Sequence, residues 1–272
     1  MSQLKQLSVH TKCIGGNYLN NKNNPVRVSI SDRYYSPSDF TTEYILKNKP
    51  EWADPENVNV IDFNSRFKNT NFKNFYLDME KRPINPIGRT GLRGRGVLGK
   101  WGPNTAADPL VTRWKRDKDN KIMMDDGGNL ILQFVAIKRK DNGEYALPGG
   151  MVEPGESLSL TAKREFGEEA LNSLEMSPKE SKALKEKLEL FFSENRCIYE
   201  GYVDDPRNTD NAWMVTKCFL WHDDTGNVMD NFKLEAGDDA CGVKWIDYSP
   251  KTDIKLYASH SSWVKHAYNL LL

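Results

Sequence analysis

Residues 150–169 read Gly-Met-Val-Glu-Pro-Gly-Glu-Ser-Leu-Ser-Leu-Thr-Ala-Lys-Arg-Glu-Phe-Gly-Glu-Glu. A glycine-rich turn here leads into a run of good helix formers. On a helix with about 3.6 residues per turn, Glu165, Glu168 and Glu169 stand at i, i+3 and i+4, within about 100 degrees of one face. The remaining small and apolar residues fall on the other side and are expected to pack against a core; they are Leu160, Phe166, Gly167, Ala170, Leu171 and Leu174.

The acidic face of this helix has two interpretations. Three ionised carboxylates repel one another unless a cation lies among them, and hard oxygen ligands without Cys or His select Mg²⁺ or Mn²⁺ over zinc. Magnesium typically binds one or two carboxylates together with phosphate oxygens of a substrate. The other interpretation is a solvated acidic face, with Lys163 and Arg164 as ordinary salt-bridge partners.

The spacing favours the metal site. Gly150, Glu156 and the run Arg164-Glu165-Phe166-Gly167-Glu168-Glu169 stand at the fixed intervals of the Nudix box, which this stretch resembles. Six fixed positions make a chance match improbable. The family pattern continues with any residue, a glycine and an aliphatic residue, whereas this chain has Ala170, Leu171 and Asn172. This departure affects the end of the helix, not the metal chemistry.

Composition limits the class of protein. The chain has 272 residues, enough for one large domain or two modest ones. Lys plus Arg and Asp plus Glu both number 38, and this zero net charge argues against a basic nucleic-acid-binding protein. No apolar run is long enough to insert directly into a membrane.

The cysteines and the first residues suggest a compartment. The four cysteines are scattered without a CxxC pair, which favours reduced thiols. The first 24 residues lack both arginine and an apolar segment, so they resemble neither a mitochondrial presequence nor a signal peptide. The sequence therefore predicts a cytoplasmic protein.

Turn formers and apolar periodicity divide the chain into three parts. Residues 1–25 are expected to be a mobile leader, and residues 26–122 a smaller, irregular N-terminal cap domain. Residues 88–102 interleave glycines with basic residues, either as a phosphate-binding loop or as a structured turn. Residues 123–272 are expected to form the catalytic core.

The core pattern predicts an α/β fold. Strands are expected at residues 110–116, 129–139, 197–203, 212–221 and 242–246, and helices at 178–195 and 261–272 besides the helix of the box. Together with the resemblance, this alternation predicts a Nudix-type α/β/α sandwich with a mixed sheet.

Further blocks narrow the resemblance. Residues 88–104, 112–114, 201–213 and 256–260 are similar to the ADP-ribose pyrophosphatase branch of the Nudix hydrolase superfamily, which has an extra N-terminal domain. The same module forms the C-terminal cytosolic domain of melastatin-type transient receptor potential channels, which open on binding ADP-ribose. In vertebrate channels the Arg-Glu-Phe part of the box is degraded and hydrolysis is lost. The box is intact here, which favours catalysis.

The resemblance implies a role for each residue of the box. Arg164 is expected to fix the glutamates by salt bridges, and Glu156 to orient Arg164. Glu168 is expected to be a metal co-ligand or the base. The implied metal ligands are Glu165, Glu168, Glu169 and the backbone carbonyl of Gly149 or Gly150.

The resemblance also implies residues that contact the substrate. Asp205 and Arg207 match positions that make polar contacts to the ligand, although Asp-Pro-Arg-Asn is also good turn chemistry. Tyr257 and His260 match the pair that lines the terminal ribose; by itself, a lone histidine is more often a cap or a surface residue. Weaker candidates near the adenine or phosphates are Thr112 and Arg113.

We therefore expect Mg²⁺-dependent hydrolysis of ADP-ribose to AMP and ribose 5-phosphate, with Mn²⁺ as an alternative metal. The runner-up is an ADP-ribose-binding regulatory domain attached to the rest of a channel polypeptide, on the cytosolic face of a membrane. A Nudix enzyme that acts on another nucleotide is a third interpretation.

Overall fold

The computed structural model describes residues 41, 43–49, 53–68, 75–88, 90, 92–173, 177–226, 228–231, 233–237 and 240–272. The expected leader, residues 1–25, lies outside the described residues. The chain divides into two compact units. Unit 1 contains the chain up to Thr105 together with Gly201–Val215, and unit 2 contains Ala106–Glu200 and Thr216–Leu272.

A seven-stranded sheet is the frame of unit 2. Its main path runs β3-β2-β1-β6-β5, while β4 pairs with β1 and β7 pairs with β2. The pairings of β2 with β1, β3 and β7 are antiparallel, as is that of β1 with β4. The strands are β1 (Gly102–Trp114), β2 (Leu132–Arg139), β3 (Tyr145–Ala146), β4 (Gly150–Met151), β5 (Arg196–Tyr202), β6 (Ala212–Asp223) and β7 (Ala240–Tyr248).

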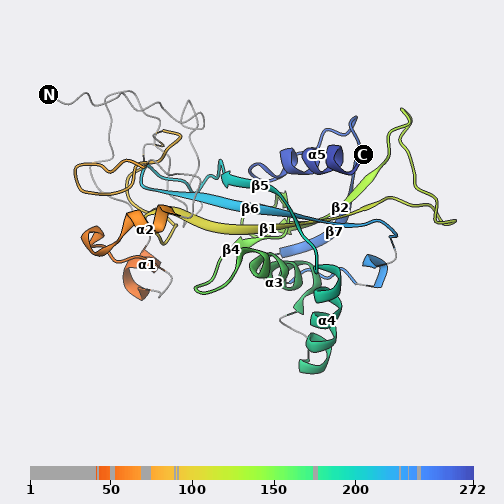
Figure 1. Ribbon diagram of the computed structural model, residues 1–272, viewed down its shortest axis with the longest axis horizontal. Helices are drawn as coiled ribbons and strands as arrows, with labels where there is room; N and C mark the ends of the chain where they lie inside the picture. Colours follow the sequence, from red (N-terminus) through yellow and green to blue (C-terminus); the bar gives the residue numbers. More distant parts are fainter. Residues whose placement is uncertain are drawn as a thin grey trace. The chain divides into compact units, whose positions relative to one another are not determined.

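Helices cover both faces of this sheet (Figure 1). On one face lie α3 (Leu158–Leu171) and α4 (Pro178–Phe191), and on the other lies α5 (His260–Leu271). This arrangement confirms the α/β/α sandwich that the sequence predicts. Among the described residues, none of the helices is long and apolar enough to cross a bilayer.

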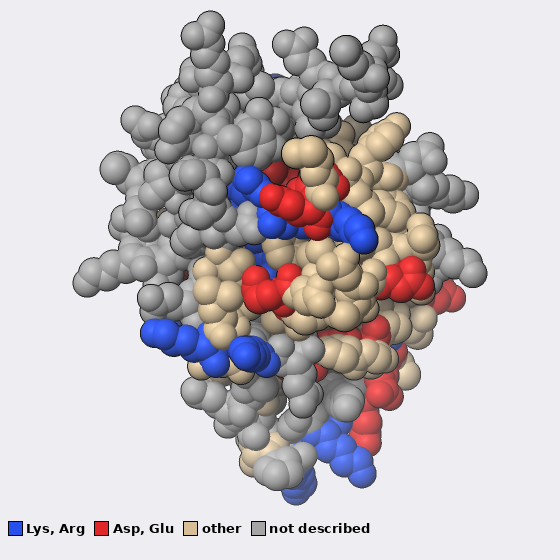
Figure 2. Space-filling view, turned by 90° about the vertical axis from the view of Figure 1, so that its left-hand side faces the viewer, with Lys and Arg blue, Asp and Glu red and all other residues tan. Residues whose placement is uncertain are grey.

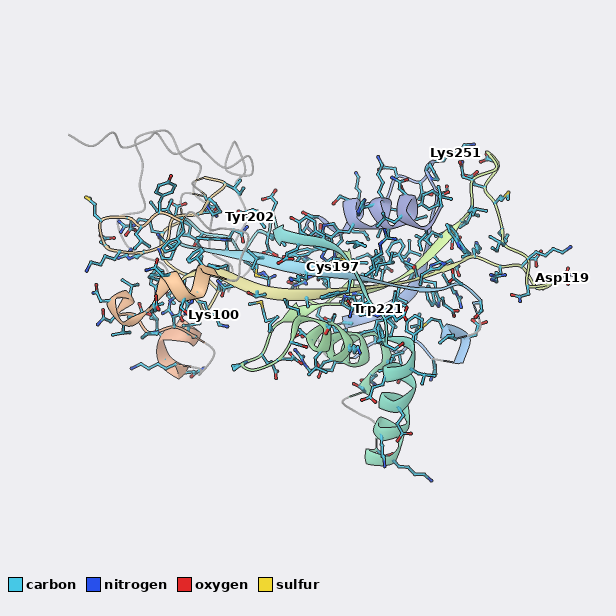
Figure 3. The ribbon with its side chains drawn as sticks, viewed as in Figure 1. Lys100, Asp119, Cys197, Tyr202, Trp221 and Lys251 are labelled. Carbon is cyan, nitrogen blue, oxygen red and sulfur yellow. The ribbon has the colours of Figure 1, made fainter. Side chains whose placement is uncertain are left out.

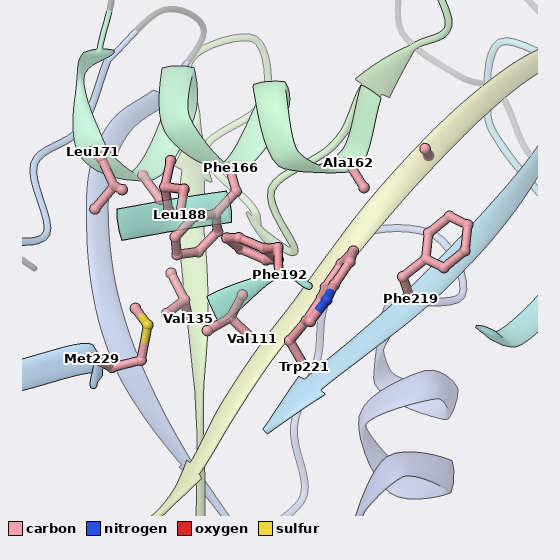
Figure 4. Close-up of a cluster of buried hydrophobic side chains, with 12 residues drawn as sticks. Val111, Val135, Ala162, Phe166, Leu171, Leu188, Phe192, Phe219, Trp221 and Met229 are labelled. Atoms are coloured by element: carbon pink, nitrogen blue, oxygen red, sulfur yellow. The ribbon is translucent and has the colours of Figure 1, made fainter. Parts of the chain in front are cut away.

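Aromatic residues build the core beneath α3 and α4 (Figure 4). Phe192 is the centre of this cluster, with ring centroids 5.5 Å from Phe166 and 4.6 Å from Trp221. Val111 of β1 and Val135 of β2 pack beneath them from the sheet. The expectation that Leu160 joins this core is wrong, because Leu160 in the first turn of α3 is exposed.

The ends of α3 are set by two polar residues. Ser157 is the N-cap, and its side chain accepts a hydrogen bond from the backbone N–H of Leu160 at 3.3 Å. Asn172 ends the helix in the left-handed conformation, with φ of 51° and ψ of 39°. Asn tolerates this conformation better than most residues. It therefore serves as the C-terminal cap of α3, one residue after the position at which the family pattern has glycine.

This cap gives a first prediction. Asn172→Ala is expected to lower the free energy of unfolding by about 1 kcal/mol, because the Cβ of alanine is strained in the left-handed region. The matched variant Asn172→Gly removes the same side chain without that strain, and we expect it to be more stable than Asn172→Ala. Urea denaturation of the two variants measures the difference. Equal stabilities would show that the αL conformation does not determine the end of α3.

Unit 1 has short elements around its own core. It contains α1 (Glu43–Asn48), a 3₁₀ turn (Val58–Val60) and α2 (Phe63–Lys68). The core is formed by Val58, Phe63, Phe67, Trp101, Trp213 and Val215. Trp213 is therefore a core aromatic.

The described part of the Gly/Arg-rich loop supports its interpretation as a turn. Arg95 is buried, stacks on Trp101 at 5.3 Å and donates a hydrogen bond to the carbonyl of Gly99 at 2.9 Å. Gly94 and Gly96 have φ of 88° and 60°, conformations that favour glycine. Burial of Arg95 lowers its pKa, an effect that the charge of Asp54 opposes. This guanidinium holds its own loop together rather than facing a ligand.

Charges of both signs mix on the surface. Figure 2 shows acidic and basic side chains of the described residues close together on one face. Ion pairs in unit 1 are of this kind, because Arg82 and Arg93 both contact Glu80. On the face shown, the described residues thus form no large patch of a single sign.

Figure 3 labels Asp119, on an arm of unit 2, and Cys197, which has a free thiol. The arm, which carries Asp119, is a ladder with bridges Arg116–Ile122 and Met124–Leu130. Among the described cysteines, Cys197 and Cys241 are exposed and Cys218 is buried, and none forms a disulfide. Burial raises the pKa of Cys218 well above its ordinary value, with further contributions from Asp108 and Cys197.

Candidate active site

Arg164 of α3 gathers the acidic side chains around it. Its Nε lies 3.0 Å from Glu156, and its Nη1 lies 2.9 Å from Glu165 and 2.8 Å from Glu168. Its Nη2 donates to the carbonyl of Met151 at 3.2 Å. One guanidinium thus links α3 to the turn that precedes it and to strand β4.

Electrostatics favour the charged forms of Arg164 and Glu156. Burial lowers the pKa of Arg164, but its hydrogen bond to Glu156 and the charges of Glu165 and Glu168 outweigh burial and raise it. Burial raises the pKa of Glu156, but hydrogen bonds from Arg164 and Thr161 outweigh this effect and lower it. Arg164 therefore stays protonated and Glu156 ionised at neutral pH.

At Gly149 and Gly150, the turn that we call the glycine cradle, the backbone lies in close contact with carboxylates. The N–H of Gly149 donates to Glu169 Oε2 at 2.8 Å. A Cβ at Gly150 would overlap the carboxylate of Glu165, and a Cβ at Gly149 would overlap that of Asp108. Only glycines at these two positions leave space for the carboxylates of Asp108 and Glu165.

Burial rejects the interpretation of α3 as a solvated acidic helix. Glu165 is 7% exposed and Glu169 is 5% exposed. A buried ionised carboxylate is costly unless it is paired or coordinates a metal. Here Glu165 is paired with Arg164, and Glu169 accepts the N–H of Gly149, so neither carboxylate is part of a solvated face.

The donor set fits a divalent cation. As they stand, the described residues contain no group of three or more His, Cys, Asp or Glu side chains arranged to hold a metal ion. A hard cation needs fewer, because Mg²⁺ binds one or two carboxylates and takes its other oxygens from water and substrate. The carboxylates of Glu165 and Glu169, which lie against the cradle of Gly149 and Gly150, fit such a requirement.

His260 and Tyr257 lie in the same unit as the glutamates. His260 is 6% exposed, and its Nδ1 accepts a hydrogen bond from the N–H of Leu147 at 2.9 Å. Tyr257 is buried, with the guanidinium of Arg139 4.4 Å from its ring centroid. The structure thus joins His260 to the residues that lead into the glycine cradle.

Asp205 and Arg207 pair with each other inside unit 1. The N–H and Nε of Arg207 both lie 2.8 Å from Asp205 Oδ1, and its Nη2 lies 2.9 Å from Oδ2. The Asp205 side chain is almost fully buried, whereas that of Arg207 is about one third exposed. The geometry therefore contains the turn expected from Asp-Pro-Arg-Asn and a forked ion pair within it.

Thr112 and Arg113 are not brought to the glutamates. Ala107 is the residue of β1 that pairs with Gly150, and Thr112 lies about 17 Å further along at about 3.3 Å per residue. Thr112 is fully buried, with its hydroxyl 2.8 Å from His222 Nδ1. Arg113 stacks on Trp245 at 4.1 Å and contacts Asp230 at 2.5 Å.

Two models of known protein families match the chain and show to which family it belongs. The model of the NUDIX domain matches residues 120–265, and that of the NUDT9-like N-terminal domain matches residues 22–102. The chain belongs to the Nudix family. Nudix pyrophosphatases generally use a divalent metal ion, which agrees with the oxygen donors of the glycine cradle.

Curated relatives refine this placement. The mitochondrial ADP-ribose pyrophosphatase of Rattus norvegicus is 56% identical over 85% of this chain and 67% of its own length. The putative nudix hydrolase 6 of Caenorhabditis elegans is 41% identical over 94% of this chain and 95% of its own length. A transient receptor potential cation channel subfamily M member-like 2 of Nematostella vectensis is 45% identical over 84% of this chain, which spans 15% of the channel.

Likeness to solved structures is weaker. A MutT/nudix family protein from Enterococcus faecalis is 21% identical, with a TM-score of 0.42 over 62% of each chain.

The cytoplasmic location expected from the sequence is contradicted by these relatives. The rat relative of this Nudix chain is named as a mitochondrial protein. The expectation rested on the scattered cysteines and, for the exclusion of a mitochondrial presequence, on the absence of arginine from the first 24 residues. That feature does not decide the compartment.

Asp108 lies against the glycine cradle, and the sequence did not single it out. It is 7% exposed, and it lies against Gly149. The only signal was an acid inside the apolar run Ala106-Ala107-Asp108-Pro109-Leu110 of a strand. A buried acid in such a strand needs partners, and this need marks it for attention.

Proposed function

We propose that this chain is a Nudix hydrolase that cleaves the pyrophosphate bond of ADP-ribose and gives AMP and ribose 5-phosphate, with Mg²⁺ as its metal. One observation carries the proposal: two nearly buried glutamates of α3 lie against a glycine cradle with no space for a Cβ. The names of the rat and nematode relatives support hydrolysis, and that of the rat relative supports ADP-ribose.

The residues of the box divide the work of hydrolysis. Glu165 and Glu169, with a carbonyl of the glycine cradle, would hold the metal. A bound divalent cation would neutralise the pyrophosphate and lower the pKa of the attacking water. Water adds to one phosphorus, the bridging oxygen leaves with the other phosphoryl group, and a proton of the water goes to a base.

Glu168 is our candidate for that base or for a further ligand. Its carboxylate lies 2.8 Å from Arg164 Nη1. Arg164 and Glu156 act through the other residues. Their ion pair at 3.0 Å fixes the guanidinium, and the guanidinium positions the two other glutamates that it contacts, Glu165 and Glu168.

The second candidate function is an ADP-ribose-sensing domain of a cation channel. The identity of 45% to the Nematostella channel protein favours it. Against it stands the intact run Arg164-Glu165-Phe166 followed by Glu168-Glu169.

Substrate preference tests the proposal. In Mg²⁺, we expect kcat/KM for ADP-ribose to exceed that for NADH, ATP and GDP-mannose by at least about a hundredfold, because a site built around one substrate leaves polar groups unpaired with another. Release of nucleoside monophosphate or inorganic phosphate from each compound measures the four values. Comparable values across the panel would leave a Nudix hydrolase without the proposed substrate.

A further inference from the structure

Asp108 is a nearly buried carboxylate of unit 2 that the box does not include. It lies on β1 next to Ala107, the residue that pairs with Gly150. Its Oδ2 accepts a hydrogen bond from the hydroxyl of Thr216 on β6 at 2.5 Å. Its Oδ1 faces Gly149 so closely that a Cβ there would overlap it. The carboxylate is thus aimed at the glycine cradle, although it belongs to a different element.

His260 stands beside Asp108 and fixes a second point of the same segment. The Nδ1 of His260 accepts the N–H of Leu147 at 2.9 Å, so this nitrogen carries no proton. A neutral ring therefore carries its proton on Nε2. That atom lies 3.8 Å from Asp108 Oδ1, and the negative charge favours a proton at this position.

The segment from Leu147 to Gly150 is therefore held at three points. His260 accepts the N–H of Leu147, Glu169 accepts the N–H of Gly149, and Asp108 lies against the Cα of Gly149. Two of these contacts come from outside α3. The backbone of this segment is thus contacted by β1 and by the first residue of α5 as well as by the helix of the box.

We propose that Asp108 and His260 form a positioning pair that fixes the Leu147–Gly150 segment against α3 and so sets the donor geometry of the metal site. Asp108 holds His260 in the tautomer that accepts from Leu147. His260 acts here on the protein backbone, a role different from the ribose contact that the family resemblance implies. This inference rests on the proposed function, because the metal site is the one that serves hydrolysis.

Two readouts test the pair, and one of them does not depend on turnover. We expect Asp108→Asn to lower kcat for ADP-ribose by about tenfold to a hundredfold with KM nearly unchanged, as is usual for groups that orient metal ligands. In the absence of substrate, we expect the same variant to bind Mn²⁺ at least about tenfold more weakly by electron paramagnetic resonance. His260→Ala should show the same losses. His260→Asn retains an acceptor near the position of Nδ1. It should therefore recover part of the kcat and part of the Mn²⁺ affinity that His260→Ala loses.

The matched control is Asp223→Asn. Asp223 is another buried aspartate of unit 2, and it accepts the N–H groups of Gly226 and Met229 at the end of β6. Its replacement should lower the thermal midpoint and leave Mn²⁺ affinity and kcat close to those of the unaltered protein. If Asp223→Asn lost as much kcat and Mn²⁺ affinity as Asp108→Asn, general destabilisation would explain the losses in both variants. That result would overturn the pair.

Two other results would also overturn the pair. One is unchanged kcat and Mn²⁺ affinity in Asp108→Asn, and the other is a rise in KM alone, which would make Asp108 a substrate contact.

Should the variants fail to fold, ¹⁵N resonances of His260 in the unaltered protein decide the question. The pair requires a proton on Nε2, and a proton on Nδ1 would contradict it. One result would support the pair and contradict the proposed function. In that result, the unaltered protein binds Mn²⁺ but does not cleave ADP-ribose, and Asp108→Asn binds Mn²⁺ more weakly.

Discussion

Glu169→Gln is expected to lower kcat roughly a thousandfold, because loss of a charged ligand removes several kcal/mol of metal-dependent stabilisation at about 1.36 kcal/mol per tenfold. The amide oxygen of glutamine still accepts the N–H of Gly149, the bond that Glu169 makes at 2.8 Å. The substitution therefore removes the charge and retains the contact. Glu165→Gln should have an effect of similar size.

Steady-state kinetics across a Mg²⁺ titration measure this effect, with thermal unfolding as the check on the fold. The matched control is Glu189→Gln on the exposed face of α4, which should retain the rate of the unaltered protein. Near-normal turnover of Glu169→Gln at saturating Mg²⁺ would remove Glu169 from the metal site.

Gly150→Ala is expected to abolish most of the activity with little effect on stability. The new Cβ would overlap the carboxylate of Glu165, which lies at the far end of a flexible side chain. That carboxylate is able to swing away at small cost to the fold, but it then leaves the position from which it would bind metal. We expect kcat to fall by about a hundredfold or more, as for a group misplaced by an ångström.

The matched control for this variant is Gly242→Ala on β7. A Cβ at Gly242 would make an ordinary contact at 3.6 Å with Lys138, so the same substitution is tolerated there. Kinetics and melting curves of both variants separate the two cases. If Gly150→Ala retained its activity, catalysis would not depend on the close approach of Glu165 to the glycine cradle.

Long elements with a clear period were predictable from the sequence. The box predicted α3, and apolar runs predicted β2 and β6, because each buries a face whose period shows in the residues. The two-residue strands β3 and β4 have no period and were not expected. β1 begins at Gly102 rather than near residue 110, because Gly-Pro-Asn-Thr at its start lacks the alternation typical of a strand.

The site was predictable only where its residues are close in sequence. Fixed spacing identifies the box glutamates, because one helix presents them together. No local pattern brings Asp108 of β1 and His260 of α5 to the same turn, since their meeting depends on the pairing of β1 with β4 and on the packing of α5. Thr112 and Arg113 resemble family residues and lie far along β1 from Gly150, so a contact of theirs with the substrate stays a prediction.

The most direct test of the proposed hydrolysis is the fate of ADP-ribose incubated with the unaltered protein and Mg²⁺. We expect AMP and ribose 5-phosphate in equal amounts by ion-exchange chromatography, with one ¹⁸O atom in one of the two products when the solvent is H₂¹⁸O. Glu169→Gln provides the blank under the same conditions. Stoichiometric binding of ADP-ribose by calorimetry, with no AMP formed over hours, would contradict hydrolysis and favour the sensing domain.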